Sequence, residues 1–206
     1  MKNMRAALRS SVFFVQDGKQ TLCIDGKICY NREAMEIKIS KTTFAEAEAV
    51  AAMYDEGRAF LRASGVDQWT DNYPVLENVF EDIESCASYL LTADGEPAAG
   101  MAIVEREPDY DKIYGGAWLT GESGEYLAVH RVCVREKFRR RGLTEKLYAF
   151  AASLVRSCGR KSLRADTHRD NLAMRAALKK NGFIECGVIY PAYGGERIAY
   201  EKVVKE

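Results

Sequence analysis

Residues 130–148 read HRVCVREKFRRRGLTEKLY, and this stretch decides how the rest of the chain is interpreted. The apolar run that ends at Val134 predicts a strand, whereas the spacing of Leu143 and Leu147 predicts a helix. The turn between them is rich in arginine, and Gly142 directly precedes the helix. Because a helix N-terminus offers unpaired N–H groups and positive potential, the stretch predicts a cradle for a pyrophosphate. A solvated helix cap is the alternative, since an arginine-rich helix start is a weak signal by itself.

The segments on both sides alternate between the periods of strands and helices. Strands are predicted at residues 35–40, 87–92, 98–105, 112–119, 126–134, 161–165, 183–190 and 197–204. Helices are predicted from Thr42 or Thr43 to Gly65, and at residues 75–85, 143–157 and 171–180. Two helices, a β-meander and a closing β-α-β-α-β-β order indicate an α/β or α+β domain with mixed strand pairing.

Residues 1–34 depart from this pattern and predict an N-terminal extension. Two dipeptides that favour hairpins, Asp17-Gly18 and Asp25-Gly26, separate three short β-prone runs. The runs are residues 11–15, 20–24 and 27–30. We expect a β-hairpin or meander there, followed by the main domain at residues 35–206.

The composition is that of a folded globular protein. Of 206 residues, 47% are hydrophobic and 29% are charged, which excludes global disorder. No apolar run approaches the roughly 20 residues of a membrane span, so we expect a cytoplasmic protein without a membrane partner. The 6 cysteines form no C-x-x-C pair, and the 2 histidines have no metal-ligand spacing. We therefore expect reduced thiols and no metal site.

The net charge of zero conceals two segments of opposite sign. Residues 67–111 carry 1 basic and 12 acidic side chains, whereas residues 131–180 carry 15 basic and 4 acidic ones. Two interpretations stay open: solvated faces of opposite charge, or a site that binds an anion at one end and attracts a cation at the other. Nucleic acid is not expected as a partner, because the basic segment lacks interleaved aromatic residues and the acidic one repels phosphate.

Arg139, Gly142 and Thr144 resemble a family motif. Between a strand and a helix, they match the [Gln/Arg]-x-x-Gly-x-[Gly/Ala] motif with which N-acetyltransferases of the GNAT superfamily bind acyl-CoA, except that Thr144 replaces the last small residue. Residues 166–171 and 180–183, with a helix between them, resemble a second segment of that family. The resemblance extends over about residues 35–204. It implies a mixed, mostly antiparallel central sheet flanked by helices in a single domain, with acetyl-CoA as cosubstrate.

The resemblance also assigns residues to acetyl-CoA. In this family the strand before the turn separates from its neighbour and pairs with pantetheine, while the turn holds the pyrophosphate. The cofactor-binding positions that it implies are Val132, Cys133, Val134, Arg139, Arg140, Arg141, Gly142, Leu143, Thr144 and Asn171. The Cys133 side chain is expected to pack without reacting.

The reaction that the resemblance implies is direct attack of a primary amine on the acetyl thioester, with a small molecule or a peptide as acceptor. An amine of pKa about 10 is mostly protonated at neutral pH, so a base must accept its proton. His130 is the candidate, because a period of two places it on one strand face with Ala128, Val132 and Val134, and an unperturbed imidazole pKa of about 6.5 suits the role. A structural histidine, hydrogen-bonded in the sheet, is the alternative.

A general acid would assist the leaving thiolate. Many relatives carry a tyrosine five residues before the phenylalanine of the Gly-Phe pair, and Leu178 occupies that position here. Tyr190 and Tyr193 are the candidates to replace it, with core or pocket-wall aromatic residues as the alternative. Because the usual tyrosine is missing, a non-catalytic acyl-CoA-binding sensor on the same fold remains a rival to the enzyme.

The acceptor side is predicted at residues 67–74. Trp69 and Tyr73 are candidates to stack on a substrate, and Asp67 or Asp71 to attract a cationic amine. A Trp69 that only covers the core is the alternative. The sequence leaves a homodimer open.

Overall fold

The computed structural model describes residues 12–16, 19–23, 35–121, 124–192 and 194–205. The chain divides into two compact units, Met1–Glu36 and Ile37–Glu206. In the first unit, β1 (Val12–Gln16) and β2 (Lys19–Cys23) pair antiparallel. These strands match the first two runs expected around Asp17-Gly18, whereas the third run, residues 27–30, lies outside the described residues.

The second unit is built on a seven-stranded sheet with the order β3-β4-β5-β6-β7-β9-β8. Its strands are β3 (Ile37–Lys41), β4 (Ser88–Ala93), β5 (Glu96–Val104), β6 (Tyr126–Val134), β7 (Ser162–Thr167), β8 (Ile184–Ile189) and β9 (Arg197–Val203). β6 and β7 are parallel, and every other neighbouring pair is antiparallel. The expected mixed, mostly antiparallel sheet is therefore confirmed.

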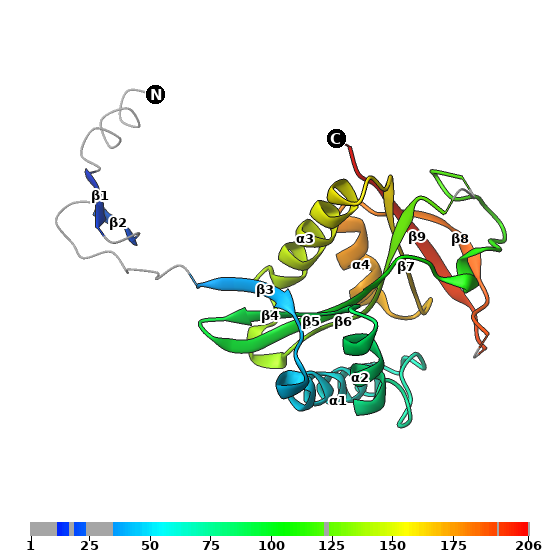
Figure 1. Ribbon diagram of the computed structural model, residues 1–206, viewed down its shortest axis with the longest axis horizontal. Helices are drawn as coiled ribbons and strands as arrows, with labels where there is room; N and C mark the ends of the chain where they lie inside the picture. The colour runs from blue at the N-terminus through cyan, green and yellow to red at the C-terminus, as the bar shows by residue number, and fades with distance from the viewer. Residues whose placement is uncertain (1–11, 17–18, 24–34, 122–123, 193, 206) are drawn as a thin grey trace, which may run out of the picture. The chain divides into compact units, whose positions relative to one another are not determined.

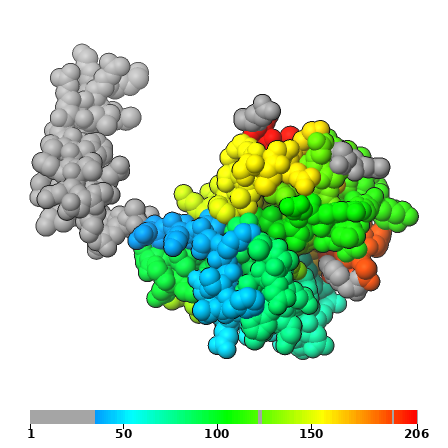
Figure 2. All heavy atoms as spheres, viewed as in Figure 1, coloured from blue at the N-terminus to red at the C-terminus, as the bar shows by residue number. Residues whose placement is uncertain are grey.

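Four α-helices flank this sheet (Figure 1). They are α1 (Ala47–Ala63), α2 (Leu76–Glu84), α3 (Leu143–Ser157) and α4 (Leu172–Lys180), with short 3-10 helices η2 (Phe44–Glu46), η3 (Pro108–Tyr110) and η4 (Glu136–Phe138) between them. α1 and α2 lie against one face of the sheet, and α3 and α4 against the other. In the space-filling view, α3 (yellow) and the blue-to-cyan atoms of β3 and α1 border the green central strands (Figure 2).

Amphipathic spacing explains where α1 packs. Val50, Met53 and Tyr54 are buried on one side of the helix, as their spacing in the sequence predicts. They form one core cluster with Leu90 of β4 and Cys133 of β6. α1 is therefore fixed directly over the strand that carries the predicted cofactor residues.

Residues 112–119, predicted as a strand, form a loop instead. An isolated bridge joins Tyr114 to Val188 there. At Gly116 an added Cβ would lie 1.9 Å from the carbonyl oxygen of Cys186, so only glycine allows this close approach. The β-prone side chains of this segment serve to pack a loop against the sheet rather than to extend the sheet.

β6 and β7 separate part-way along their length. Their parallel pairing runs from Tyr126 opposite Ser162 to Ala128 opposite Arg164, and no further β6–β7 pair is formed in the described part of the chain. The separation that the family resemblance implies is therefore present, and it opens the sheet near its centre.

A β-bulge lies on β6 beside this opening. Two residues of β6, Arg131 and Val132, face a single residue of β5, and Arg131 has a left-handed φ of 51°. The bulge shifts the alternation of side chains along β6. His130 therefore lies on the same face of the strand as Cys133, and not on the face of Val132 and Val134. The prediction that His130 shares a face with those valines is therefore wrong, because a period of two does not continue through a bulge.

Candidate active site

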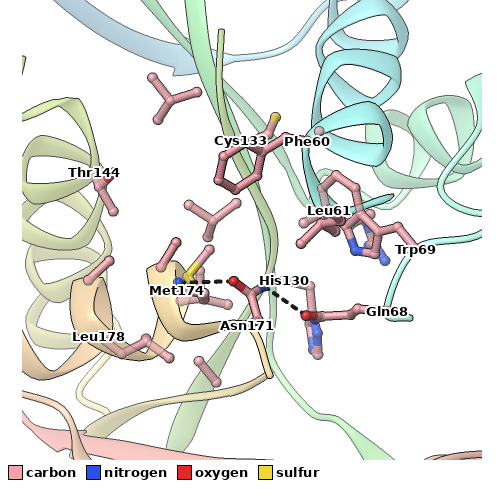
Figure 3. A pocket seen from close by; sticks show the side chains of 18 of the residues that line it. Phe60, Leu61, Gln68, Trp69, His130, Cys133, Thr144, Asn171, Met174 and Leu178 are labelled. Carbon is pink, nitrogen blue, oxygen red and sulfur yellow. Dashed lines mark hydrogen bonds between the residues drawn. The ribbon is translucent and has the colours of Figure 1, made fainter. Parts of the chain in front are cut away.

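A cavity of about 250 Å³ lies where β6 separates from β7 (Figure 3). Residues 129–134 of β6 line it. Phe60 and Leu61 of α1 line it from one side, and Met174 and Leu178 of α4 from the other. Apolar side chains on both sides are typical of a pocket that holds an organic ligand.

A second cavity, of about 230 Å³, adjoins the first at the start of α3. Val134, Arg139 and Thr144 line both cavities, so the two are direct neighbours. Of the predicted cofactor positions, all but Arg141 line one cavity or both. The Arg141 guanidinium lies instead over the ring of Phe138, at 5.5 Å from its centroid.

Backbone geometry makes the start of α3 an anion site. Gly142 is the N-cap residue, with a left-handed φ of 78°, and no described side chain caps the helix. The first N–H groups of the helix therefore point out of its end. Arg139, Arg140 and Arg141 take part in none of the ion pairs between described residues. The charges of Arg139 and Arg140, which line the second cavity, thus remain available to a phosphate.

Asn171 ties the two sides of the first cavity together. Its Oδ1 accepts a hydrogen bond from the Met174 N–H at 3.1 Å, which caps α4, and its Nδ2 donates to Gln68 Oε1 at 2.9 Å (Figure 3). Gln68 Oε1 also accepts from the Thr167 hydroxyl at 3.0 Å. Asn171 lines the cavity, but both ends of its amide are engaged within the protein, and the sequence motif does not indicate this use.

Cys133 lines the cavity but is not arranged to react. Its side chain is buried in the core cluster under α1, and burial raises the pKa of its thiol to about 12. A thiol with this pKa is almost wholly protonated at neutral pH, and only the thiolate is a good nucleophile. The burial agrees with the packing role expected for Cys133.

His130 lines the first cavity and contacts Glu107. The part of the cavity lined by His130 and Asp166 is called its inner end. The buried Nε2 of His130 is 3.2 Å from Glu107 Oε2. Burial alone would raise the pKa of Glu107, but the contact with His130 and its charge bring this pKa below its ordinary value. The Tyr126 hydroxyl holds Glu107 in place, 3.1 Å from its backbone nitrogen and 3.1 Å from its carbonyl oxygen. Because Nε2 faces a carboxylate, Nδ1 is the nitrogen that remains for a ligand.

Asp166 of β7 reaches the same cavity from the strand that separates from β6. It is the only carboxylate among the described residues that line the cavity. The Tyr110 hydroxyl donates to Asp166 Oδ1 at 2.7 Å, and the Tyr110 ring lies 5.9 Å from that of His130. Burial raises the pKa of Asp166, although His130 and Tyr110 act in the opposite direction. Of this polar cluster, which also includes Glu107, only His130 was predicted.

The pattern of β7 could have indicated Asp166. Ser162, Arg164 and Asp166 alternate with apolar residues, which predicts a polar strand face turned into the protein. The first two of them bond to Glu201 of β9, at 2.5 and 3.0 Å. Tyr110 carries no comparable pattern, because it reaches Asp166 from a loop 56 residues earlier.

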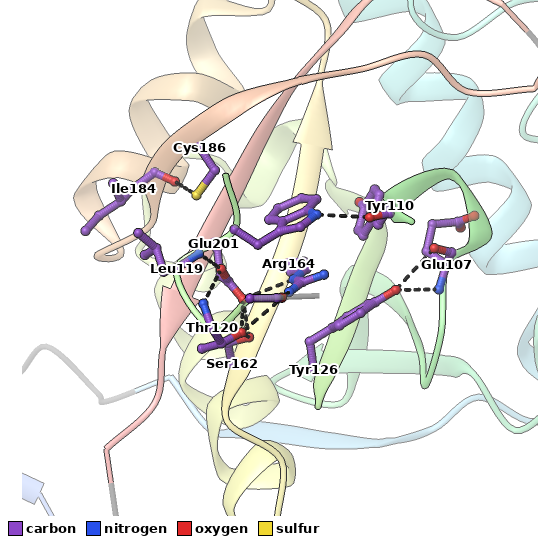
Figure 4. Close-up of polar contacts among 12 residues, drawn as sticks. Glu107, Tyr110, Leu119, Thr120, Tyr126, Ser162, Arg164, Ile184, Cys186 and Glu201 are labelled. Atoms are coloured by element: carbon purple, nitrogen blue, oxygen red, sulfur yellow. Dashed lines mark hydrogen bonds and ion pairs between the residues drawn. The ribbon is translucent and has the colours of Figure 1, made fainter. Parts of the chain in front are cut away.

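A buried ion pair fixes the loop that supplies Tyr110 (Figure 4). The Arg164 guanidinium lies 4.2 Å from the ring centroid of Trp118 and 4.1 Å from that of Tyr126. Its Nε donates to Glu201 Oε1 at 3.0 Å, and the two side chains are only 2% and 0% exposed. Trp118 in turn donates to the Tyr110 carbonyl oxygen at 2.9 Å. The loop is thereby clamped to β7 and β9, and Tyr110 is held against Asp166.

Arg131, at the bulge, is fully paired. Its Nε and Nη2 donate to Asp82 of α2 at 2.8 and 2.5 Å, and its Nη1 donates to the Tyr73 hydroxyl at 2.9 Å. Burial by itself lowers the pKa of Arg131, but Tyr73 and Asp82 raise it above its ordinary value. Arg131 therefore stays charged, and all three of its guanidinium nitrogens are engaged within the protein.

Trp69 and Tyr73 line the cavity on the side predicted for the acceptor. Trp69 also packs on the core, because its ring meets that of Tyr54 edge-on at 5.6 Å between centroids. At Gly57 an added Cβ would lie 2.5 Å from the indole, so this side chain is held closely against α1. The placement of Trp69 is compatible with both interpretations, a core cover and a wall of the acceptor site.

Three other predicted residues do not reach the cavities, and a fourth is not described. Asp67 and Asp71 are exposed and line neither cavity. Tyr190 is 55% exposed and also lines neither, and its hydroxyl lies 3.4 Å from Glu196 Oε2. Tyr193 lies outside the described residues. The carboxylate of the inner end is instead supplied from the basic segment, residues 131–180, to which Asp166 belongs.

The acidic and basic segments of the chain contact each other in the fold. Residues 67–111 and 131–180 are joined by the ion pairs Asp82–Arg131, Glu96–Lys137 and Glu105–Arg160. Part of the charge segregation thus holds the domain together. Within the part of the chain that is described, no group of three or more His, Cys, Asp and Glu side chains could hold a metal ion. No described helix has the length and apolar character needed to cross a membrane.

The family model for GNAT acetyltransferases matches residues 50–183. The chain belongs to the GNAT family of acetyltransferases. The matched range contains every residue that lines the two cavities, and it ends at Phe183 of the Gly-Phe pair. Both cavities of this GNAT acetyltransferase therefore lie within the part of the chain that the family model matches.

Solved structures share the fold. A GNAT-family acetyltransferase from Streptococcus agalactiae is 29% identical, with a TM-score of 0.75 over 82% of this chain and 96% of that chain. One from Listeria monocytogenes is 18% identical, with a TM-score of 0.61 over 93% and 99% of the two chains. A structure from Salmonella typhimurium, determined with its cofactor acetyl-CoA, is 15% identical, with a TM-score of 0.60 over 82% and 95%. No curated protein matches the chain.

Proposed function

We propose that this protein is an N-acetyltransferase that moves the acetyl group of acetyl-CoA to a primary amine by direct attack. The observation that carries the proposal is the path formed by the two adjoining cavities. It leads from the uncapped, arginine-rich start of α3 to His130 in the opening between β6 and β7. The phosphates would bind at the α3 end of this path, and the thioester would lie at the His130 end.

The residues along the path suit acetyl-CoA. Arg139, Arg140 and the first N–H groups of α3 offer positive charge and donors to a pyrophosphate. Beyond the last β6–β7 pair, the backbone of β6 has peptide groups with which the pantetheine amides could pair. Acetyl-CoA in a structure of the same fold from Salmonella typhimurium supports this choice of cosubstrate.

The chemistry requires the amine to lose a proton before it attacks. One ammonium proton passes to Nδ1 of His130, and the neutral nitrogen attacks the thioester carbonyl carbon. The Glu107 carboxylate, 3.2 Å from Nε2, stabilises the imidazolium that forms. Peptide N–H groups beside the bulge would stabilise the developing oxyanion. When the C–S bond breaks, the one excess proton on the nitrogen of the adduct passes to the departing thiolate, and the imidazolium of His130 returns its proton to solvent.

Direct transfer is favoured over an acetylated enzyme. Cys133 is the only thiol among the described residues that line the cavity, and burial raises its pKa to about 12. It is therefore a poor nucleophile at neutral pH. The departing thiol has a pKa of about 8.5, so a general acid is helpful but not compulsory. The absence of an acidic group at Leu178 is compatible with turnover.

Release of CoA thiol tests the proposal. Protein and acetyl-CoA are mixed with a panel of primary amines, and the acetylated amine is identified by mass spectrometry. We expect equal amounts of thiol and N-acetyl product, and neither product without an amine. A protein that binds acetyl-CoA but forms neither product with any amine would be the non-catalytic acyl-CoA sensor.

We further propose that residues 35–206 form the catalytic domain and that residues 1–34 are an extension of it. The family match lies within the proposed domain, and the chain divides into its two units at Glu36. Removal of residues 1–34 is therefore expected to leave CoA release and the melting temperature of the domain unchanged. Loss of folding in the shortened chain would contradict this boundary.

A further inference from the structure

We propose that Asp166 recognises the acceptor by binding its ammonium group. This inference rests on the proposed N-acetyl transfer and specifies the class of amine. The acceptors are then cationic amines on an apolar stem, with no carboxylate beside the reacting nitrogen. Asp166 lines the cavity as its only carboxylate among the described residues. The residues predicted to attract the amine, Asp67 and Asp71, line neither cavity.

The charges around the inner end of the cavity favour a cation. Besides His130, the described cations that line the cavity are Arg131 and Arg139. Arg131 donates from all three nitrogens to Asp82 and the Tyr73 hydroxyl. Arg139 also lines the second cavity, at the α3 end of the path. Among the described residues that line the cavity, no guanidinium at the inner end would therefore be available to a carboxylate on the acceptor, and that carboxylate would face Asp166.

The position of Asp166 suits an amine that reacts beside His130. Asp166 and His130 belong to β7 and β6, the two strands that separate, and both line the cavity between them. The Tyr110 hydroxyl holds Asp166 Oδ1 at 2.7 Å, and no described residue donates a hydrogen bond to Oδ2. A bound ammonium would replace the solvation that burial removes from this carboxylate. It would also stand close enough to His130 to give up its proton.

Apolar side chains line the remaining space next to this end. Leu61, Trp69 and Met174 line the same cavity, and none of them carries a charge. Such a wall favours an alkyl or aromatic stem on the amine, because burial of that stem removes apolar surface from water. Recognition thus divides into a charge contact at Asp166 and apolar contacts along the stem.

Calorimetric binding to the full chain saturated with CoA tests this assignment. The three probes are hexylamine, its neutral isostere hexanol, and norleucine, an amine with a carboxylate beside the nitrogen and a stem one carbon shorter. In the wild type we expect hexylamine to bind at least about tenfold more tightly than either of the others. Asp166→Asn should weaken hexylamine about tenfold and leave hexanol unchanged. Tyr110→Phe is the matched control, because it removes the hydrogen bond but keeps the charge, and it should change hexylamine binding by less than about threefold.

Three results would overturn the assignment. They are equal affinities of the wild type for hexylamine and hexanol, tight binding of norleucine, and an Asp166→Asn protein that binds hexylamine like the wild type. If Asp166→Asn does not fold, the wild-type comparison alone decides. CoA release is measured in parallel, so the two proposals can fail separately. If CoA is released but hexylamine and hexanol bind equally, the acetyl transfer is supported and the role of Asp166 is rejected. If hexylamine binds more tightly but no CoA is released, the role of Asp166 is supported and the acetyl transfer is rejected.

Discussion

The two ends of the cavity path are built in different ways. At the cofactor end, residues 134–144 supply the end of a strand, a turn and a helix start in one continuous stretch. The acceptor end is assembled from three separate parts of the chain: His130 on β6, Asp166 on β7, and Glu107 with Tyr110 in the loop after β5. The first depends on local backbone geometry, and the second depends on long-range packing that a buried ion pair holds in place.

Their electrostatics differ in the same way. Arg139, Arg140 and Arg141 make no ion pair with described residues, so the cofactor end attracts phosphate through charges that act together. At the acceptor end the charged groups are held by specific contacts at short range, such as His130 with Glu107 and Tyr110 with Asp166. We therefore expect variants of the turn to change the KM for acetyl-CoA, and variants of the polar cluster to change kcat or the KM for the amine.

Replacement of the proposed base should have the largest effect. His130→Gln is expected to lower kcat/KM by about 1,000-fold, because a positioned general base contributes about 10²–10⁴-fold. The rise in rate with pH that reflects loss of the His130 proton should disappear, while the KM for acetyl-CoA stays unchanged. Steady-state kinetics across a pH series measure both. His168→Gln is the control, since that histidine lines neither cavity. An unchanged pH profile in His130→Gln would reject the base.

Replacement of two arginines in the turn should have the second-largest effect. The double variant Arg139→Ala/Arg140→Ala is expected to raise the KM for acetyl-CoA about 100-fold, since each lost charge-assisted hydrogen bond costs about 1.5 kcal/mol. The KM for the amine should change by less than about twofold. Arg141→Ala, whose side chain lines neither cavity, is the matched control and should have a small effect. Equal increases in both KM values would show that the two ends are not separate.

The clamp beneath the acceptor end should affect stability. Glu201→Gln weakens the buried pair with Arg164 and is expected to lower the free energy of unfolding by about 3 kcal/mol. Urea unfolding measures this loss. Lys137→Gln, which breaks an exposed pair with Glu96, is the control and should cost less than about 1 kcal/mol. A Glu201→Gln protein as stable as the wild type would show that this ion pair does not stabilise the fold.

The same clamp predicts a dependence on pH. Burial raises the pKa of Glu201, but hydrogen bonds from Ser162, Thr120 and Arg164 bring it below the ordinary value. A carboxyl group whose pKa is depressed in the folded state stabilises the protein above its unfolded pKa, about 4.3 for glutamate. That stabilisation is lost as the pH falls through the folded pKa. Unfolding free energies measured from neutral to acid pH should therefore fall more steeply for the wild type than for Glu201→Gln.

Tyr190 should have the smallest effect. Its hydroxyl is on the surface and lines neither cavity, so Tyr190→Phe is expected to leave kcat within about twofold of the wild type. The rate of CoA release at saturating substrates measures this. A tenfold loss of kcat in Tyr190→Phe would mean that this side chain reaches the leaving thiol. It would then support the prediction that Tyr190 is the general acid.

Prediction from the sequence succeeded where the relevant contacts are local. The spacing of Val50, Met53 and Tyr54 predicted the buried side of α1, and the run up to Gly142 predicted the helix start. It failed where distant segments decide the structure. Residues 112–119 form a loop because Gly116 meets the backbone at Cys186, a contact between residues far apart in the chain. The bulge at Arg131, whose side chain is paired with Asp82, left no mark in the strand pattern.

A crystal structure of the protein with bound acetyl-CoA would show whether the cofactor lies along the two cavities. We expect the pyrophosphate at the start of α3, against Gly142 and Thr144, and the thioester in the opening between β6 and β7, next to Nδ1 of His130 and on the side of Asp166. A pyrophosphate bound away from the α3 N-terminus, or an acetyl group that lies outside the opening and out of reach of His130, would contradict this expectation.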